Sequence, residues 1–270
     1  MQETATFWHA GDIGNVELLK ARYVSHTFSR HTHTGYVIAI IERGVEAYHY
    51  RGATHFALPG DIVLINPDMV HTGHAGIKSG WTYRVFYPSI DLIKGLAEDM
   101  AQKKGGIPYF NATVIKDAPL ARELGRLHRT LENSTSRMER QAGFNEVIGR
   151  LLLKHAGNPP RLMPLGREHW AMQKAVAYIN DTIYENISLE ELSTQVGLSP
   201  FHFSRVFTKH MGLPPHAYRK QLRIYKAKQL LLKRMPISQV AAETGFADQS
   251  HLTRHFKQIV GVTPGQFIGL

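Results

Sequence analysis

The feature that most constrains this chain is an internal repeat in its last third. One segment reads LSTQVGLSPFHFSRVFTKHMGLPPHAY and a later one reads VAAETGFADQSHLTRHFKQIVGVTPGQF. Gly197 aligns with Gly245 at an offset of 48 residues, and one extra residue then makes the offset 49. At this second offset the identical pairs are His202/His251, Arg205/Arg254, Phe207/Phe256, Gly212/Gly261 and Pro215/Pro264. We therefore expect the same short structural unit to occur twice.

Each copy predicts a helix, a tight turn and a second helix. Ser188 and Glu191 have the spacing of a capping box, which starts a helix. Gly197 suits the left-handed conformation that ends this helix, and Ser199 can cap the next helix, which opens at Pro200. The second copy repeats this plan at Pro236, Gly245 and Asp248. Such a unit is a helix-turn-helix, a motif that places its second helix in the major groove of DNA.

The segment between the copies predicts one long basic helix. Residues 216–234 contain neither Pro nor Gly and carry seven Lys or Arg. A rigid helix suits two recognition helices that enter successive major grooves about 34 Å apart. The chain has a formal net charge of +10, and residues 169–270 hold 12 Lys or Arg against 6 Asp or Glu. This positive charge favours a polyanionic partner, although a basic protein without such a partner would show the same composition.

Two arginines are the strongest candidates for contacts to DNA bases. Arg205 and Arg254 occupy equivalent positions of the repeat, and each follows a small hydroxyl residue, Ser204 or Thr253. Arginine that binds guanine through two hydrogen bonds is the commonest specific base contact. The alternative is that both arginines are solvated surface charges. For His202 and His251 we expect packing between helices rather than contact with DNA.

The C-terminal third resembles AraC/XylS-type transcriptional regulators over roughly Trp170 to Phe267. The resemblance rests on the A-x-x-x-G-F, L-T-R-x-F-K and G-x-T-P-x-x-F segments. It implies two helix-turn-helix units joined by a long helix, with DNA-reading residues early in the second helix of each unit. Carried over to this chain, these residues are Phe201, Ser204, Arg205, Gln249, Ser250, Thr253 and Arg254. Phe201 stands where polar residues are frequent, so apolar contact to a thymine methyl group is expected there.

The first ninety residues follow a different pattern, which predicts an antiparallel β-sandwich or barrel. Short apolar segments such as YVIAIIERG, VEAYHYRG and WTYRVFYP are separated by Gly and Pro. Helical spacing then follows, with an apolar stripe at Phe144, Val147, Ile148, Leu151 and Leu152. This stripe packs either on its own barrel or in a dimer seam, and we favour the dimer. The predicted organisation is an effector-binding and dimerisation domain at 1–156, a linker at 157–168 and a DNA-binding domain at 169–270.

The N-terminal part also resembles a cupin-like barrel, as AraC-type regulators often carry. His31 and His33 supply the H-x-H of metal-binding cupins, and Gly44 stands at the expected glycine. The metal-binding glutamate of that pattern falls on Val37, which cannot bind a metal, so we expect neither a metal nor another cofactor. His71 lies near the third histidine position. We expect His31, His33 and His71 to bind a small effector, with Tyr48 and Trp81 as the apolar wall; the alternative is a solvent-facing rim.

These observations predict a two-domain α+β protein that binds double-stranded DNA and responds to a small effector, and not an enzyme. One alternative is a cupin-type metal-dependent enzyme with an added helical domain; another is a constitutive DNA-binding protein whose barrel only dimerises. The chain has no cysteine, no signal-peptide pattern and no long apolar segment, so we expect a cytoplasmic protein without a membrane partner. A homodimer is expected, and RNA polymerase is a candidate partner.

Overall fold

The structure is a computed structural model, and it describes residues 3–162 and 168–269, without the side chain of His169. The chain divides into two compact units, which are described separately. The first comprises Met1–Asn133 with Gly143–Met163, and the second comprises Ser134–Ala142 with Pro164–Leu270. The first unit contains the β-structure and the second is helical.

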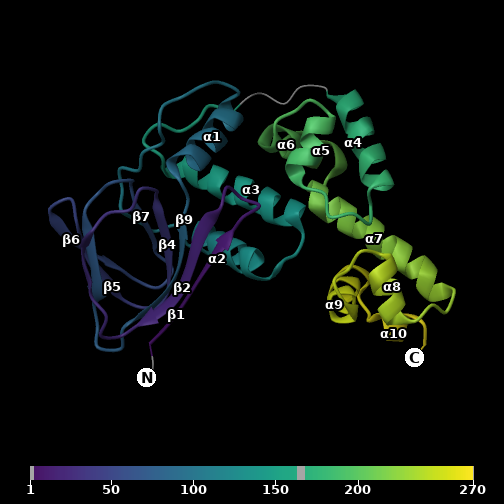
Figure 1. The fold of residues 1–270 in the computed structure, drawn as a ribbon, viewed down its shortest axis with the longest axis horizontal. Helices are drawn as coiled ribbons and strands as arrows, with labels where there is room; N and C mark the ends of the chain where they lie inside the picture. Colours follow the sequence, from purple (N-terminus) through teal and green to yellow (C-terminus); the bar gives the residue numbers. More distant parts are fainter. Residues whose placement is uncertain (1–2, 163–167, 270) are drawn as a thin grey trace. The chain divides into compact units, whose positions relative to one another are not determined.

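The first unit consists of two antiparallel sheets (Figure 1). The six-stranded sheet has the order β1 (Thr4–Ala10), β2 (Val16–Tyr23), β9 (Trp81–Tyr87), β4 (Val37–Gly44), β7 (Ile62–Ile65) and β10 (Val114–Ile115). The four-stranded sheet has the order β3 (Phe28–His31), β8 (His71–Ala75), β5 (Glu46–Tyr50) and β6 (Ala53–Ala57). The expected cupin-like architecture is confirmed, although these strands form two sheets rather than a closed barrel.

The core of this unit lies between the two sheets because alternate side chains of each strand face inward. Val37, Ala39 and Ile41 of β4 and Tyr48 and Tyr50 of β5 are all buried in one cluster. The opposite face of the six-stranded sheet buries a second set of residues, among them Leu18, Ile38, Ile40 and Phe86. Alternation thus buries both faces of the central strands.

Helix α1 (Ile90–Ala101) follows the last long strand and begins where Ser89 caps it, while α2 (Ala118–Asn133) contacts β4 and β9. A buried polar group fixes α2 to the sheet. Arg84 of β9 binds Glu42 at 2.8 Å and Glu132 at 2.9 Å, and His128 of α2 bonds the Val85 carbonyl at 3.2 Å. The pairing satisfies an arginine that is only 6% exposed.

The apolar stripe expected to form a dimer seam is buried inside the single chain. Helix α3 (Arg137–His155) carries Phe144, Ile148, Leu151 and Leu152, and each of these side chains is 0% exposed. The stripe therefore packs within its own chain, which is the alternative reading of the sequence. The expected dimer seam at these residues was wrong, because helical periodicity marks an apolar face without identifying what covers it.

The second unit is a series of helices that carries the two helix-turn-helix copies. They are α4 (His169–Asp181), α5 (Leu189–Gln195), α6 (Pro200–Met211), α7 (Pro215–Leu232), α8 (Ile237–Glu243), α9 (Gln249–Val260) and α10 (Pro264–Phe267). The capping box of Ser188 and Glu191 is present, and Asp248 accepts a hydrogen bond from the His251 amide at the start of α9. Gly197 and Gly245 have φ of 68° and 70°, so the predicted left-handed turns are confirmed.

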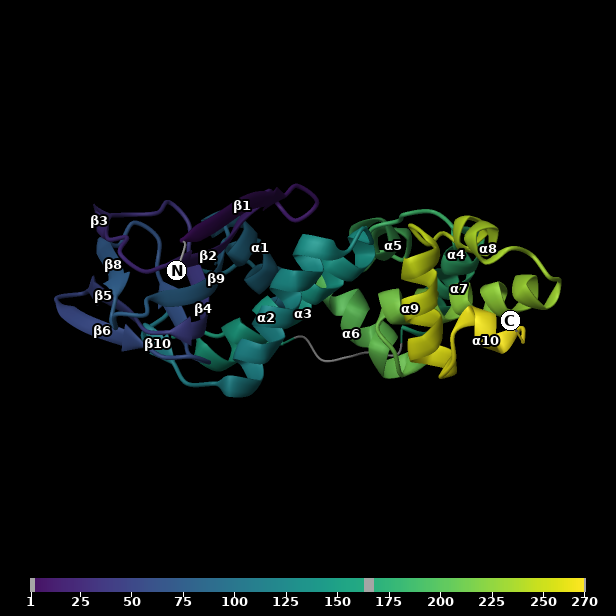
Figure 2. The ribbon, with the colours of Figure 1, turned by 90° about the horizontal axis from the view of Figure 1, so that it is seen from below.

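The long helix α7 joins the two copies and bonds to both. Arg223 donates hydrogen bonds to the carbonyls of Ile183 and Glu185 before α5, and to the Gly245 carbonyl in the turn before α9. Figure 2 shows α8 and α10 beside α9, in agreement with their contacts. The Arg223 guanidinium thus links the first helix-turn-helix copy to the turn between α8 and α9 in the second copy.

The boundary between the units differs from the expected domain limits. The first turns of α3 belong to the helical unit, where Met138 and Ala142 are buried with the residues around α5 and α6. Glu139 forms an ion pair with Lys220 of α7 at 3.0 Å. The expected linker at 157–168 falls partly on 163–167, outside the described residues. Helix α3 is therefore continuous from one unit into the other.

Candidate effector cavity and DNA-binding surface

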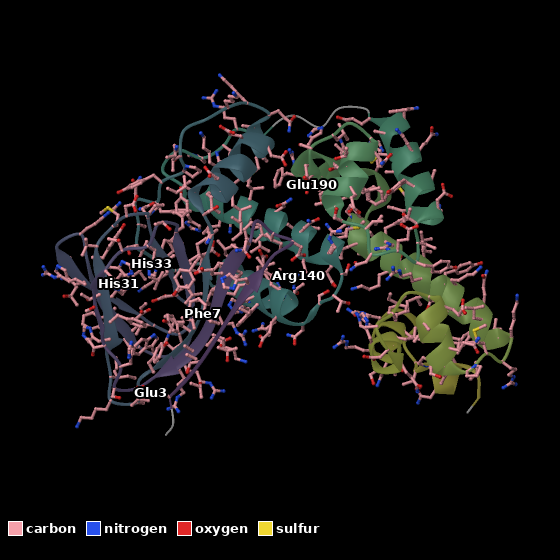
Figure 3. All side chains as sticks on the ribbon, viewed as in Figure 1. Glu3, Phe7, His31, His33, Arg140 and Glu190 are labelled. Atoms are coloured by element: carbon pink, nitrogen blue, oxygen red, sulfur yellow. The ribbon has the colours of Figure 1, made fainter. Side chains whose placement is uncertain are left out.

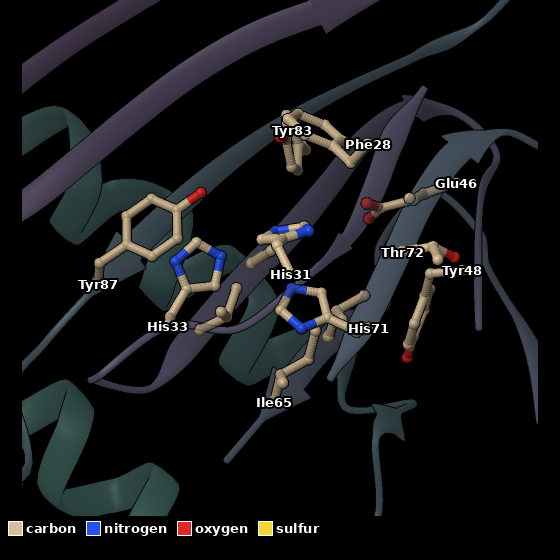
Figure 4. Close-up of a pocket in the computed structure, with 14 residues that line it drawn as sticks. Phe28, His31, His33, Glu46, Tyr48, Ile65, His71, Thr72, Tyr83 and Tyr87 are labelled. Atoms are coloured by element: carbon tan, nitrogen blue, oxygen red, sulfur yellow. The ribbon is translucent and has the colours of Figure 1, made fainter. Parts of the chain in front are cut away.

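Three histidines meet at a cavity between the two sheets of the first unit (Figure 4). The ring centroids of His31 and His71 are 4.3 Å apart, and those of His31 and His33 are 4.9 Å apart. The two sequence neighbours do not share a strand, because β3 ends at His31 and His33 follows it. Figure 3 shows both inside the β-unit. The expected pair is therefore brought together by a strand end rather than by strand alternation.

The orientation of two of these imidazoles is fixed by the backbone. His31 Nδ1 lies 2.8 Å from the Ser29 carbonyl oxygen, and His71 Nδ1 lies 3.0 Å from the Met69 carbonyl oxygen. A carbonyl only accepts, so each Nδ1 carries a proton, and in the neutral form of each ring the lone pair is on Nε2. Burial lowers the pKa of His33 to about 4 and also lowers the pKa of His71, and the neighbouring histidines add to both effects. His33 and His71 are therefore uncharged at neutral pH.

A buried carboxyl group lies in the same cavity. Glu46 of β5 is 8% exposed, and burial raises its pKa to about 8. Within residues 3–162 and 168–269 we find no hydrogen bond or ion pair to its carboxylate. The sequence analysis missed Glu46, although it alternates with Tyr48 on one strand, so the two had to face the same side. The cavity thus combines imidazoles with an unpaired carboxyl group.

Aromatic and aliphatic side chains complete the wall. Tyr48, one of the predicted residues, lines the cavity, as do Tyr83 and Tyr87. Val37 also lines it, at the position where the cupin pattern has a metal-binding glutamate. The cavity has a volume of about 60 Å³, which is enough to hold water molecules. Such a space fits a small polar ligand.

Trp81 does not line this cavity, in contrast to the sequence-based expectation. It is 1% exposed and packs on Tyr23 and Tyr83 with centroid distances of 5.3 and 5.8 Å. Its strand neighbour Tyr83, two residues on, takes the expected place in the wall. Alternation along the sequence shows which face of the sheet a side chain lies on. Its position along the strand decides whether that side chain reaches the cavity.

The predicted DNA-binding residues of the second copy lie on the outer side of α9. Gln249, Ser250 and Arg254 are exposed and Thr253 is half-buried. On the opposite side of the helix, Leu252 and Phe256 are 0% exposed and hold α9 to the unit. The spacing of core and exposed residues thus gives α9 one face for packing and one face open to a partner.

In the first copy, the exposed side of α6 is built differently. Ser204 and Arg205 are half-buried, and the Arg205 guanidinium lies over the Phe201 ring at 5.9 Å. Phe201 itself is 7% exposed and its ring lies beneath Arg205, which leaves little of the ring open for the expected contact with a thymine methyl group. His202 Nε2 bonds Glu168 at 3.0 Å, in line with the expected packing role.

Comparisons with known proteins agree with this combination of sites. Residues 13–148 match the AraC-like ligand binding domain family, and residues 192–269 match a helix-turn-helix domain family. The chain is 28% identical over 238 residues to the uncharacterized HTH-type transcriptional regulator YbfI of Bacillus subtilis, covering 88% of this chain and 86% of that protein. It is 26% identical to the arabinose operon regulatory protein of Escherichia coli, covering 86% and 80%.

The ligand-binding domain and the helix-turn-helix domain define a transcriptional regulator that binds DNA and a small molecule. More particularly, the chain belongs to the AraC family, because the ligand-binding match alone spans half of it. A further relative, the lactose operon transcription activator of Staphylococcus xylosus, is 23% identical and covers 82% of this chain and 80% of that protein. Among the described residues, no helix is long and apolar enough to cross a membrane.

Proposed function

We propose that the chain reads DNA through α6 and α9 and that a small polar molecule in the histidine cavity controls this activity. The observation that carries the proposal is the equivalent placement of Arg205 and Arg254 near the same point of the second helix in each copy. If these two side chains were only solvated surface charges, nothing would require arginine at this position in both copies. Two equivalent arginines on one rigid chain suit two successive major grooves.

Each predicted residue has a role that its position supports. Arg205 and Arg254 would bind guanine edges, and Gln249 would bind adenine or a phosphate. Ser204, Ser250 and Thr253 have short hydroxyl side chains that suit phosphate or base contacts close to the helix. Phe201 would act through Arg205, by holding the guanidinium in place. Arg254 is the most exposed of the two arginines, so it is the first residue to test.

DNA binding is tested with the full chain and the DNA upstream of its own coding sequence. We expect saturable binding to a defined site that weakens steeply as salt increases, because bound phosphates release counterions. Random DNA of the same length is the control and should bind at least about a thousandfold more weakly. Equal affinity for the two DNAs would refute sequence-specific recognition.

Effector binding is tested by the melting temperature of the full chain with sugars, amino acids and small carboxylic acids. A ligand at a hundred times its Kd adds about 2.7 kcal/mol to the stability of the unit that binds it. Tyr87→Phe should reduce this shift because Tyr87 lines the cavity, whereas His9→Ala on the exposed strand β1 should not. A shift that Tyr87→Phe and a second cavity variant, His33→Ala, both leave unchanged would place the effector elsewhere.

The remaining features of the proposal concern partners and location. A cytoplasmic location follows from action on DNA, and contact with RNA polymerase would follow for an activator. A homodimer rests on the family resemblance alone, since the apolar stripe of α3 is covered in the single chain. Light scattering at two protein concentrations tests the dimer. A catalytic role is not proposed, because the relatives that match are transcriptional regulators.

A further inference from the structure

We propose that His31, His33 and His71 together bind one divalent transition-metal ion, for which Zn²⁺ is the best fit. This departs from the sequence-based expectation of no metal, which depended on the missing carboxylate at Val37. The proposal concerns the same cavity as the proposed effector site, and it rests on that function only for the ion's part in effector binding.

The first argument is the convergence of the ligand atoms. One nitrogen from each of the three histidines lies within 4.8 Å of the others. Three zinc–nitrogen bonds of about 2.0–2.1 Å in a tetrahedral site place the nitrogens roughly 3.3 Å apart. Closing the present distances therefore needs movement of about 1.5 Å at most. Rotation of His33 can supply it, because this residue follows the end of β3 and its imidazole makes no hydrogen bond to the backbone of the described residues.

The second argument is the support behind two of the ligands. Metal-binding histidines almost always donate their second ring N–H to a carbonyl or carboxylate, which fixes the tautomer. His31 and His71 both do so, each to the carbonyl of the residue two positions earlier. His31 and His71 are also direct partners in the β3–β8 register, so the two supported rings come from adjacent strands. An arrangement that served only to pack the core would not need the same tautomer twice.

The third argument is the chemistry of the donor set. Three neutral imidazoles suit zinc and related transition metals, whereas calcium and magnesium require mostly oxygen ligands. Three histidines leave at least one coordination position for water or an effector oxygen, as in open zinc sites. Figure 4 shows the Glu46 carboxyl group directed into the same cavity as the three histidines. Glu46 is thus a further oxygen donor close to the proposed site.

This arrangement gives the effector a chemical class. A molecule with a carboxylate, hydroxyl or carbonyl oxygen would complete the coordination of the ion, and the tyrosines of the wall would contact its remaining atoms. The metal is then a fixed part of the effector site and not a catalyst.

The test uses full-length protein without a polyhistidine tag, stripped of metal by a chelator and titrated with CoCl₂ and ZnCl₂ alone. We expect one ion per chain, visible absorption from Co²⁺ in a site of low coordination number, and displacement of Co²⁺ by Zn²⁺. His31→Gln and His71→Gln should each weaken binding at least about 100-fold, since even the loss of a supporting hydrogen bond costs 10- to 100-fold. These variants keep a polar side chain, and circular dichroism checks that they fold.

The matched control is His74→Gln, on the same strand as His71 but outside the cluster. It should bind metal as the original chain does. No saturable one-to-one binding, or binding that survives both His31→Gln and His71→Gln, would overturn the proposal. Effector-induced melting shifts in metal-free protein would also overturn the ion's part but would leave the proposed effector site intact. Metal binding without any effector response would leave the metal site intact and would overturn the proposed effector site.

Discussion

The ion pair between Glu139 and Lys220 gives a quantitative prediction about the helical unit. Glu139 lies in the first turns of α3, accepts a hydrogen bond from Ser134 at 2.7 Å and pairs with Lys220 of α7 at 3.0 Å. Burial alone would raise its pKa, but Lys220 and Ser134 outweigh this and lower the pKa to about 2, from 4.5. A carboxyl group whose pKa is lower in the folded state stabilises that state above its unfolded pKa.

The size of this contribution follows from the pKa difference. A shift of about 2.5 units at 1.36 kcal/mol per unit corresponds to roughly 3 kcal/mol at neutral pH. This is an upper figure, because the Glu139 side chain remains 24% exposed. The stabilisation should be complete above about pH 5 and should disappear as the pH falls from 4.5 towards 2. Glu139→Gln should therefore lose about 2–3 kcal/mol at neutral pH and almost nothing near pH 2.

The assay is urea unfolding of the full chain, followed by helical circular dichroism at several pH values. Glu146→Gln is the control, since Glu146 lies on the same helix in an exposed pair with Arg150 and should cost at most about 0.5 kcal/mol. A difference between Glu139→Gln and the original chain that is the same at every pH would refute the reasoning. So would a loss no larger than that of Glu146→Gln.

Three further substitutions test other parts of the structure. Arg223→Ala should destabilise the helical unit by about 2–4 kcal/mol, because three carbonyls lose charged donors; Lys226→Ala, exposed on the same helix, is the control in the same urea assay. Gly245→Ala should cost at least about 1 kcal/mol in melting experiments, since its φ is 70° and a Cβ would lie 2.9 Å from the Arg223 guanidinium; a neutral result would contradict the turn geometry. Leu151→Ala should cost about 2–5 kcal/mol without changing the oligomeric state, and dissociation of a dimer would instead restore the seam.

The sequence predicts the helical unit well because its signals are local. Ser188, Glu191, Gly197, Pro200 and Asp248 each act on a neighbouring turn, so spacing along the chain was sufficient to place four helix ends. Because the unit occurs twice, the second copy supports the helix and turn predicted at each position of the first. Strand positions in the first unit were also predicted, because Gly and Pro separate the short apolar segments.

The cavity was only partly predictable because it depends on contacts between distant segments. Tyr48 and the histidines were identified, but Glu46 was missed and Trp81 was assigned to the wall although it packs outside the lining. Alternation gives the face of a strand, whereas depth in the sandwich depends on the register between strands. Likewise, no local pattern could show that the first turns of α3 belong to the helical unit.

The most direct test of the account compares the affinity of Arg254→Ala for the specific upstream site with its affinity for random DNA. Because Arg254 lies on the exposed side of α9, we expect a loss of about 1–3 kcal/mol, or roughly 5- to 150-fold, on the specific site and little change on random DNA. Lys257→Ala, at the exposed end of the same helix, should weaken both equally. Equal losses for Arg254→Ala on the two DNAs would mean that Arg254 contacts phosphate only, and would contradict base reading by α9.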